Sequence, residues 1–279
     1  MKTVDILKTL NEKEPLIHCI TNPISMTQCA NAVLALGAKP IMAEHPAEVR
    51  EITASAGALL LNLGNISDIR MEAMERAYEA AVERGIPVVI DAVGSACSAL
   101  RREFVLKLLK DSGKQGQALI VKGNYSEIMA LYDAAYKGKG VDADKSLELE
   151  AITQVAAKIA ENYGVVVLAS GKTDIVTDGR KEYLIENGTS FLGKITGTGC
   201  MLGAVAAAFL GGDPGDAAEI CALSAAAFGI AGELAEEALL SEKGKVGSGS
   251  FLTALLDELS FLTDEKIRER MRITAKNET

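Results

Sequence analysis

The sequence is poor in histidine, and this scarcity bears on which enzyme classes it can represent. Among its 279 residues, only His18 and His45 are histidines. A catalytic zinc site commonly uses histidine ligands, and a serine-histidine triad needs a histidine beside its nucleophile. The sequence therefore offers no obvious set of parts for a zinc hydrolase or a serine-histidine hydrolase.

Cysteine is also sparse, and its spacing shows no pattern. The five cysteines are an odd number, are widely separated and have no paired metal-ligand spacing: Cys19, Cys29, Cys97, Cys200 and Cys221. Disulfide frameworks and zinc sites both need regular, paired cysteines. A reducing compartment is the simplest interpretation, and we expect a cytoplasmic protein.

Three further features are missing: a basic block, a secretory leader and a long apolar run. The formal net charge is -9, with acidic residues spread along the chain, which predicts no nucleic-acid partner. Residues 1–5 are mixed and polar, unlike the start of a signal peptide. The apolar stretch 201–210 is about half of the roughly 20 residues that cross a bilayer, so we expect no membrane association.

What the sequence does contain is a repeating pattern of buried strands and amphipathic helices. Apolar residues make up 48% of the chain, enough for one large domain over residues 1–279. Continuous apolar runs of strand length alternate with segments of helical periodicity. The predicted strands are 58–61, 88–90, 119–121 and 165–168, and the predicted helices are 26–36, 71–84, 104–109 and 152–163. This alternation predicts a mostly parallel sheet with helices on both faces and ligands at the carboxyl ends of its strands.

The pattern changes after residue 168. Segments 173–178 and 182–186 read as two short strands joined at an Asp-Gly turn, which would extend the sheet in antiparallel fashion. Residues 200–238 are alanine-rich and helical, with a break at 213–215. Beyond these elements we expect only a short polar tail at 276–279.

The sharpest local motif is the turn Gly197-Thr198-Gly199, which stands directly before the alanine-rich helix. Backbone N–H groups at a helix start, with the positive end of the helix dipole, form a site for a phosphate or a developing anion. A glycine-rich helix start without a ligand explains the same pattern. The P-loop pattern is absent, and the turn comes too late in the chain for a dinucleotide fingerprint.

Cys200 follows this turn and would lie in the first turn of the helix. The helix dipole favours a thiolate there, so Cys200 is a candidate base. A small buried cysteine at the head of an apolar helix is the alternative.

Two acidic residues at predicted strand ends form a second candidate site. Asp91 follows the strand 88–90, and Glu127 follows the polar segment Lys122-Gly123-Asn124. One or two carboxylates, with waters and substrate phosphates, are what magnesium takes in kinases. The alternative makes Asp91 a helix cap and Glu127 an ordinary acid of a first helical turn.

Taken together and in order, these motifs resemble the hydroxyethylthiazole kinase family of the ribokinase-like superfamily, and the resemblance covers nearly the whole chain. Its most specific pieces are His18-Cys19-Ile20-Thr21-Asn22, Asn31, the segment 37–48, Asp91, Lys122-Gly123-Asn124, Ser126-Glu127, Gly197-Thr198-Gly199-Cys200 and the segment 247–251.

The resemblance implies a three-layer α/β/α fold and transfer of the γ-phosphoryl group of ATP to the primary hydroxyl of 4-methyl-5-(2-hydroxyethyl)thiazole. It also implies a homotrimer with active sites between subunits. By matching positions, it places Met42, Asn22 and Gly197 on the acceptor, Lys122, Ser170 and Gly199 on ATP, Asp91 and Glu127 on magnesium, and Cys200 beside the acceptor hydroxyl.

The chain departs from the family pattern at some positions. Ala92 replaces a usual proline, and Lys122 replaces a frequent arginine, which keeps the charge and loses the planar fork. Cys200 stands where related sugar kinases carry an aspartate, so we expect it to orient the hydroxyl or to act as a weak base. Two other functions remain open: a ribokinase-like kinase of another small alcohol, such as a hydroxymethylpyrimidine or a sugar, and a nucleotide sensor without catalysis.

Overall fold

A single curved sheet organises the chain in the computed structural model, which describes residues 5–110, 117–136 and 149–277. The prediction that the chain has no secretory leader rests partly on residues 1–4, which lie outside this range. The sheet has nine strands in the order β2-β1-β3-β4-β5-β6-β7-β8-β9. The strands are β1 (Leu16–Ile20), β2 (Lys39–Ile41), β3 (Ala58–Asn62), β4 (Val88–Asp91), β5 (Leu119–Asn124), β6 (Val166–Ser170), β7 (Asp174–Thr177), β8 (Lys181–Ile185) and β9 (Ile273–Asn277).

Strands β1 to β6 pair in parallel, and β7, β8 and β9 continue the sheet antiparallel. This confirms the mostly parallel sheet that the sequence predicts. The hairpin at 173–186 is confirmed too, because β7 and β8 pair across a turn in which Gly179 has a φ of +88°. Such a positive φ suits glycine.

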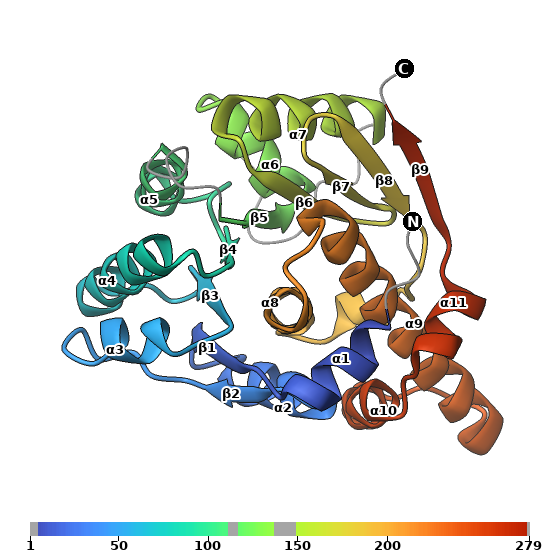
Figure 1. Ribbon diagram of the computed structural model, residues 1–279. Helices are drawn as coiled ribbons and strands as arrows, with labels where there is room; N and C mark the ends of the chain where they lie inside the picture. Colours follow the sequence, from blue (N-terminus) through green and yellow to red (C-terminus); the bar gives the residue numbers. More distant parts are fainter. Residues whose placement is uncertain (1–4, 111–116, 137–148, 278–279) are drawn as a thin grey trace.

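Helices cover both faces of the sheet, as Figure 1 shows, and the sheet curls around α8. The helices are α1 (Ile6–Lys13), α2 (Met26–Ala35), α3 (Val49–Ala54), α4 (Asp68–Arg84), α5 (Ala99–Lys110), α6 (Tyr125–Tyr132), α7 (Leu149–Tyr163), α8 (Thr198–Gly212), α9 (Ala217–Lys243), α10 (Ser248–Ser260) and α11 (Asp264–Arg270). One core joins the sheet to α1, α2 and α8 to α11, and a second core joins its other face to α3 to α7. The result is a three-layer α/β/α arrangement.

Strand β3 illustrates why continuous apolar runs mark the centre of this sheet. All five of its residues are buried. Ala58 and Leu60 face the core around α8, whereas Leu59 and Leu61 face the core on the other side. A strand with helices on both faces needs apolar residues at every position, since successive side chains point to opposite faces.

The carboxyl-terminal region agrees with the predicted helices and corrects the predicted tail. Helices α8 and α9 are separated near residues 213–215, as expected. The segment 276–279 is not simply a polar tail, because Lys276 and Asn277 belong to β9. Backbone pairing with β8 outweighs the polar composition, and Lys276 Nζ also lies 3.0 Å from Glu182 Oε1. Residues 278–279 lie outside the described range.

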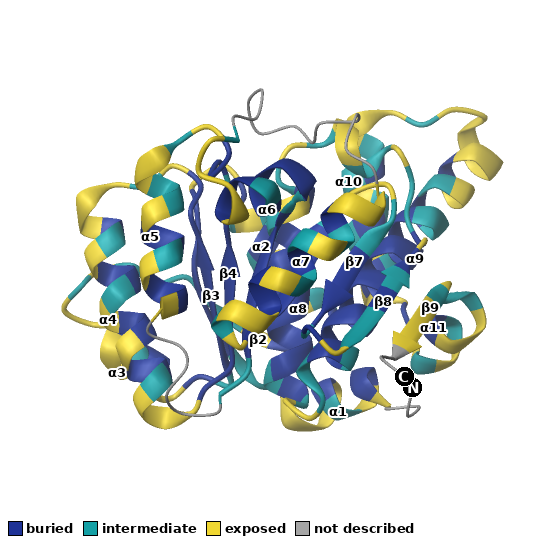
Figure 2. Ribbon diagram, turned by 90° about the horizontal axis from the view of Figure 1, so that it is seen from above, coloured by how far each residue is buried: buried dark blue, intermediate teal, exposed yellow. Residues whose placement is uncertain are grey.

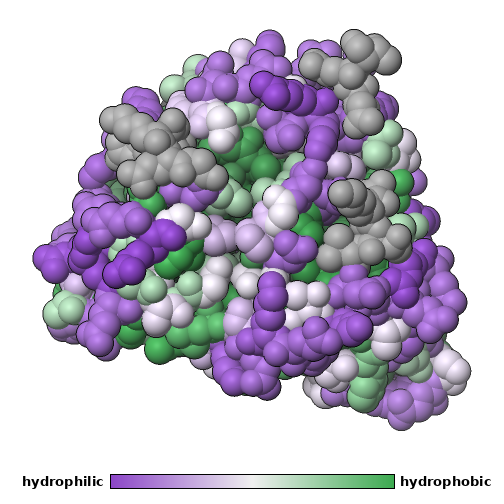
Figure 3. Space-filling model, in the orientation of Figure 1, coloured by the Kyte–Doolittle hydropathy of each residue, from purple (hydrophilic) through white to green (hydrophobic). Residues whose placement is uncertain are grey.

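Within the described residues, α9 is the one helix whose length and composition would allow it to cross a membrane, and 78% of its most apolar window is buried inside the fold. Core helices of globular proteins have this character. Figure 2 shows the same burial for the sheet and for α8, with exposed residues on the outer faces of the helices. In Figure 3, polar residues cover most of the face seen in Figure 1, and apolar patches lie between them.

Candidate active site

The candidate residues gather where the parallel strands end. Asn62 and Asp91 are the last residues of β3 and β4, and they pair in register. On the next strand Lys122 pairs with Asp91, and farther along Asn124 pairs with Ser170 at the end of β6. Parallel strands present their carboxyl ends at one edge, so these side chains come together although they are distant in sequence.

A chain of hydrogen bonds crosses this edge from the loop after β1 to β5. Asn22 Nδ2 donates to Asn62 Oδ1 at 2.9 Å, and Asn62 Nδ2 donates to Asp91 Oδ2 at 2.8 Å. Lys122 Nζ then donates to the other oxygen of Asp91 at 3.0 Å. All four side chains are buried. Buried polar groups need such partners because an unpaired group costs its full desolvation energy.

The chain also reaches Cys200. Asn22 Nδ2 donates to Cys200 Sγ at 3.4 Å, and Asn22 Oδ1 accepts the backbone N–H groups of Ile24 and Ser25, each at 3.1 Å. Since the amide oxygen is committed to two backbone donors, the amide nitrogen must face Cys200. The sulfur atom of Cys200 is therefore an acceptor in this contact.

Asp91 and Lys122 form a buried ion pair. Burial raises the pKa of Asp91 above its ordinary value, although Lys122 and Asn62 act in the opposite direction. Burial alone would lower the pKa of Lys122, but the charges of Asp91, Cys200 and Glu127 raise it. We take both groups as charged, because each is the hydrogen-bonded partner of the other and an isolated charge at this depth would be far more costly.

Glu127 has a structural role that the alternative interpretation foresaw. With Asn124 it forms a capping box at the start of α6: Asn124 Oδ1 accepts the N–H of Glu127 at 2.9 Å, and Glu127 Oε2 accepts the N–H of Asn124 at 2.7 Å. Its other oxygen accepts the N–H of Gly94 at 2.7 Å. Burial, and then the charge of Asp91, raise the pKa of Glu127 to about 7.

The glycine turn lies at the start of α8, as the sequence predicts. Gly197 has φ +94° and ψ -7°, a backbone conformation that suits glycine, and it packs against Ser25. The first backbone bond of the helix runs from the N–H of Met201 to the carbonyl of Gly197 at 2.8 Å. The N–H groups of Gly199 and Cys200 therefore have no acceptor within the helix.

The start of α8 lies directly against the ion pair. A Cβ atom on Gly199 would lie 3.6 Å from Lys122 Nζ, and one on Gly203 would lie 3.5 Å from Asp91 Oδ2. The helix start and the strand-end charges thus belong to one site. Cys200 is half-buried in the first turn of this helix.

Ser170 and Met42 occupy opposite sides of this edge. The hydroxyl of Ser170 donates to the carbonyl of Gly123 at 3.3 Å, which ties the end of β6 to β5. Met42 follows β2 directly, is half-buried and packs against the core around α8. The structure thus joins Asn22, Asp91, Lys122 and Cys200 by contact, while the other candidates surround them at the same sheet edge.

Asn62 is the central residue that sequence reasoning missed. It links Asn22 to Asp91, and its Oδ1 also accepts the N–H of Gly64 at 2.9 Å. The signal was present, because Asn62 ends the apolar run 58–61 just as Asp91 ends the run 88–90. A polar residue directly after a buried strand is as informative when it is an amide as when it is an acid.

The acidic residues fit a hydrated magnesium ion rather than a metal cage. No cluster of three or more histidine, cysteine, aspartate or glutamate side chains suited to a metal occurs among the described residues. Each oxygen of Asp91 and Glu127 already accepts one hydrogen bond. A carboxylate oxygen has a second lone pair, and magnesium keeps several waters while using one or two carboxylates.

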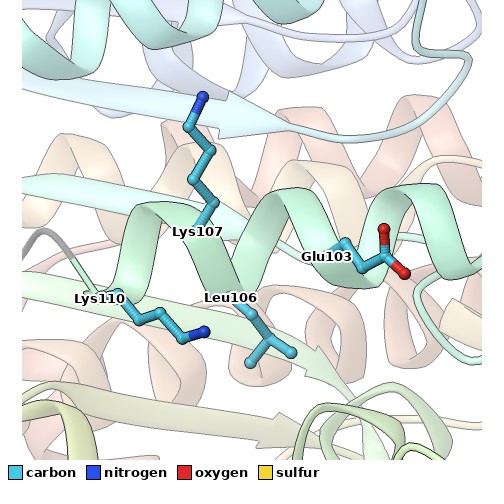
Figure 4. A pocket seen from close by; sticks show the side chains of 4 residues that line it. All are labelled: Glu103, Leu106, Lys107 and Lys110. Atoms are coloured by element: carbon cyan, nitrogen blue, oxygen red, sulfur yellow. The ribbon is translucent and has the colours of Figure 1, made fainter.

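One open hollow on the surface is unrelated to these residues. It lies along α5 and is lined by Glu103, Leu106, Lys107 and Lys110 (Figure 4). Lys107 Nζ pairs with Glu75 Oε1 at 2.6 Å, which is an ordinary surface ion pair between helices. We assign no ligand to this hollow.

Comparison with known proteins identifies the family of the chain. Residues 7–265 match the model of the hydroxyethylthiazole kinase family. Hydroxyethylthiazole kinase 2 of Clostridium botulinum (strain Langeland) is 38% identical over 277 residues, covering 98% of this chain and all of the relative.

Solved structures extend the likeness to the fold. The structure of the hydroxyethylthiazole kinase protein from Pyrococcus horikoshii OT3 matches with a TM-score of 0.84 and 31% identity, covering 99% of this chain and 100% of that one. A ribokinase-like superfamily protein from Enterococcus faecalis matches with a TM-score of 0.60 and 10% identity, covering 88% and 86%. The second match bears on the fold alone. The first, with the family model and the relative, shows that the chain belongs to the hydroxyethylthiazole kinase family, within the ribokinase-like fold.

Proposed function

We propose that the protein transfers the γ-phosphoryl group of ATP to the primary hydroxyl group of 4-methyl-5-(2-hydroxyethyl)thiazole, as a step of thiamin salvage. As a member of its family the protein is a kinase with ATP as co-substrate. The observation that carries the proposal is the chain of hydrogen bonds that runs from Cys200 through Asn22, Asn62 and Asp91 to Lys122. This chain lies against the start of α8.

The donor side of the site suits a triphosphate. Free N–H groups at the start of α8 suit phosphate oxygens, with the helix dipole in support, and Lys122 adds a positive charge beside them. Ser170, at the end of β6, would lie along ATP. Asp91 and Glu127 would hold magnesium, whose chemistry when bound is to neutralise charge on the phosphate oxygens.

The acceptor side would be formed by Met42, Asn22 and Gly197. An apolar side chain with one or two polar groups suits a flat heteroaromatic alcohol better than a sugar, which needs several polar partners. In the reaction the hydroxyl oxygen bonds to the γ-phosphorus, the bond to the leaving oxygen of ADP breaks, and the hydroxyl proton passes to Cys200 or to water. Cys200, held by Asn22, orients that hydroxyl, since phosphoryl transfer depends chiefly on positioning and charge neutralisation.

The test is a panel of acceptor alcohols incubated with purified protein, ATP and magnesium, with ADP production as the readout. We expect turnover of the thiazole alcohol, its loss on chelation of magnesium, and much weaker turnover of a hydroxymethylpyrimidine and of ribose. Preference for one of those other alcohols would reassign the acceptor. ATP binding by calorimetry without turnover of any alcohol would identify a sensor instead.

We also propose that the chain, one domain over its 279 residues, works as a cytoplasmic homotrimer with active sites between subunits. Ile24 is 54% exposed only two residues from Asn22, and Leu34 of the following helix is 55% exposed. Apolar side chains beside the acceptor side favour a subunit contact there. All five cysteines are free, in keeping with a reducing compartment. Light scattering should give three times the 29.4 kDa chain mass, and a monomer with full activity would contradict the shared site.

A further inference from the structure

His18 is a fully buried histidine in the middle of β1, outside the hydrogen-bonded chain of the active site. Both of its ring nitrogens have partners. Nδ1 lies 2.8 Å from Thr53 Oγ1 on α3, and Nε2 lies 2.9 Å from the carbonyl oxygen of Ala43. The side chain therefore connects β1 to the segment 42–48, which follows β2 and begins with Met42.

The partners of His18 decide where its proton lies. A carbonyl oxygen only accepts, so Nε2 must carry hydrogen and donate to Ala43. The hydroxyl of Thr53 can donate to the unprotonated Nδ1 of a neutral ring. Burial lowers the pKa of His18, partly offset by the bond to Ala43 and the charge of Glu48, which favours the neutral ring at neutral pH. In the neutral ring, Nε2 of His18 therefore donates a hydrogen bond to the carbonyl oxygen of Ala43.

A second side chain holds the same segment from α4. The largely buried Arg70 donates to Glu44 Oε2 through Nε at 2.9 Å, and its Nη2 lies 2.9 Å from the same oxygen. Its Nη1 donates at 2.7 Å to the carbonyl of Asn65, in the loop after β3. Ala43 is thus held to β1 by His18, and Glu44 is held to α4 by Arg70.

We propose that His18 is a positioning residue for the acceptor side of the site: through Ala43 it fixes the backbone beside Met42 and so the side chain that faces the acceptor. The proposal rests on the proposed function for the role of Met42. It explains why a polar ring occupies a fully buried strand position where its neighbours Ile17 and Cys19 are apolar or nearly so. An aliphatic residue would fill the volume, but it would leave the carbonyl of Ala43 without this donor.

Two substitutions separate the bond to Ala43 from mere packing. In His18→Gln the amide reaches the place of Nε2 and can still donate to Ala43, whereas in His18→Asn the shorter amide reaches only the place of Nδ1 and its Thr53 partner. We expect His18→Asn to raise the KM for the thiazole alcohol roughly 3- to 10-fold, the size of one net hydrogen bond. The KM for ATP should change less than about twofold, and His18→Gln should restore the acceptor KM to within about threefold of wild type.

Hydrogen exchange of the peptide covering residues 40–48 gives a readout that needs no substrate. We expect faster exchange in His18→Asn than in wild type or His18→Gln, with no difference in a control peptide from α7. Equal exchange and equal acceptor KM in both variants would overturn the proposal, as would an equal rise of both KM values, which indicates general loosening. If wild type does not turn over the thiazole alcohol, the proposed function fails, and the exchange data still decide whether His18 holds this segment.

Discussion

At the scale of single residues, the electrostatics of the site depend on one lysine that faces several acids. Lys122 is 3% exposed and bonds directly to Asp91, and the charges of Cys200 and Glu127 also raise its pKa. Removing one member of such a group leaves the others buried without compensation. Lys122, which we propose to contact the phosphates of ATP, is therefore also the residue that allows the acids to be buried.

The substitution Lys122→Met tests this double role through stability. We expect it to lower the free energy of unfolding by about 3 kcal/mol, because the carboxylate of Asp91 loses its buried counter-charge. The double variant Asp91→Asn/Lys122→Met should recover a large part of that loss. Urea denaturation of the three proteins measures the difference, and equal losses in the single and double variants would contradict the buried ion pair.

Glu127 predicts a pH dependence of stability with a definite sign. Its pKa rises from the ordinary 4.5 to about 7 in the folded protein, so between these values the folded chain holds a proton that the unfolded chain releases. The free energy of unfolding that Glu127 contributes is thus highest at the acidic end and falls as the pH rises towards about 7.

Glu127→Gln isolates this contribution, since the amide does not titrate. The variant also loses an acceptor for Gly94 or Asn124, but that cost is the same at every pH. We expect the difference in unfolding free energy between wild type and variant to shrink as the pH rises through the range from 4.5 to about 7. Denaturant titrations across this range measure it, and a constant difference would show that Glu127 ionises normally.

The sequence allowed most of the site to be predicted at this scale, for a simple reason. Asp91 and Lys122 stand at or near the end of continuous apolar runs, and strand order brings such ends together. Asn62 escaped because its run was read as ending at Leu61, and an amide drew less attention than an acid. The contact between Asn22 and Cys200 joins positions 178 residues apart, which no local pattern encodes.

At the scale of helices and strands, close packing depends on glycine where α9 meets the loop after β8. A Cβ atom on Gly229 would lie 2.6 Å from the backbone carbonyl carbon and oxygen of Asn187. Backbone atoms cannot move aside as a flexible side chain can. This close approach brings the long helix directly against the segment that joins the hairpin to α8.

Two glycine substitutions should change the free energy of unfolding in opposite directions. Gly229→Ala should lower the free energy of unfolding by about 2 kcal/mol through overpacking. Gly249→Ala, near the start of α10 where nothing lies within 4 Å of the added carbon, should raise it by roughly 0.5 kcal/mol through helix propensity. Thermal and urea unfolding compare the two, and stabilisation by Gly229→Ala would contradict the close approach.

The strands that were predicted differ from those that were missed in how far their burial is written in the local sequence. The runs at 58–61, 88–90, 119–121 and 165–168 became β3 to β6 with small shifts at their ends, because strands buried on both faces must be apolar throughout. Strands β1 and β2 were absent from that set. One contains the polar His18, whose partners come from distant segments, and the other is three residues long with Pro40 in its centre. Strand β9 looked like a tail because Thr274, Ala275 and Lys276 are exposed, and only backbone pairing with β8 makes the segment a strand.

At the scale of the whole molecule, the sheet combines a parallel part that carries the site with an antiparallel part that closes the fold. Strands β3 to β6 hold Asn62, Asp91, Lys122 and Ser170. Strands β7 to β9 extend the sheet away from them, with β9 at its outer edge. The two parts share the core around α8 and α9. Because β9 lies at the outer edge, separated from β4 by four strands, a change there should lower stability while leaving the candidate site in place.

Ending the chain at Arg272 tests this separation, because it removes β9 and its pairing with β8. We expect the Tm to fall by roughly 5 °C, while kcat/KM for the thiazole alcohol stays within about twofold of wild type, since four strands of the sheet order lie between β9 and β4. Calorimetry and steady-state kinetics on the same preparation check both. A large loss of activity at unchanged Tm would show that the edge strand acts on the site.

Helix α8 begins at the glycine turn of the candidate site and ends at Gly212. Its penultimate residue, Gly211, lies beside Ile17 and Ala58, near the opposite ends of their strands. The residues of this helix are buried along nearly its whole length, so one continuous helix passes through the core from the candidate site to the far side of the sheet. No break in the helix separates its start from the rest. Warming should therefore abolish turnover and melt the fold over the same few degrees, without an inactive intermediate that keeps its tertiary packing.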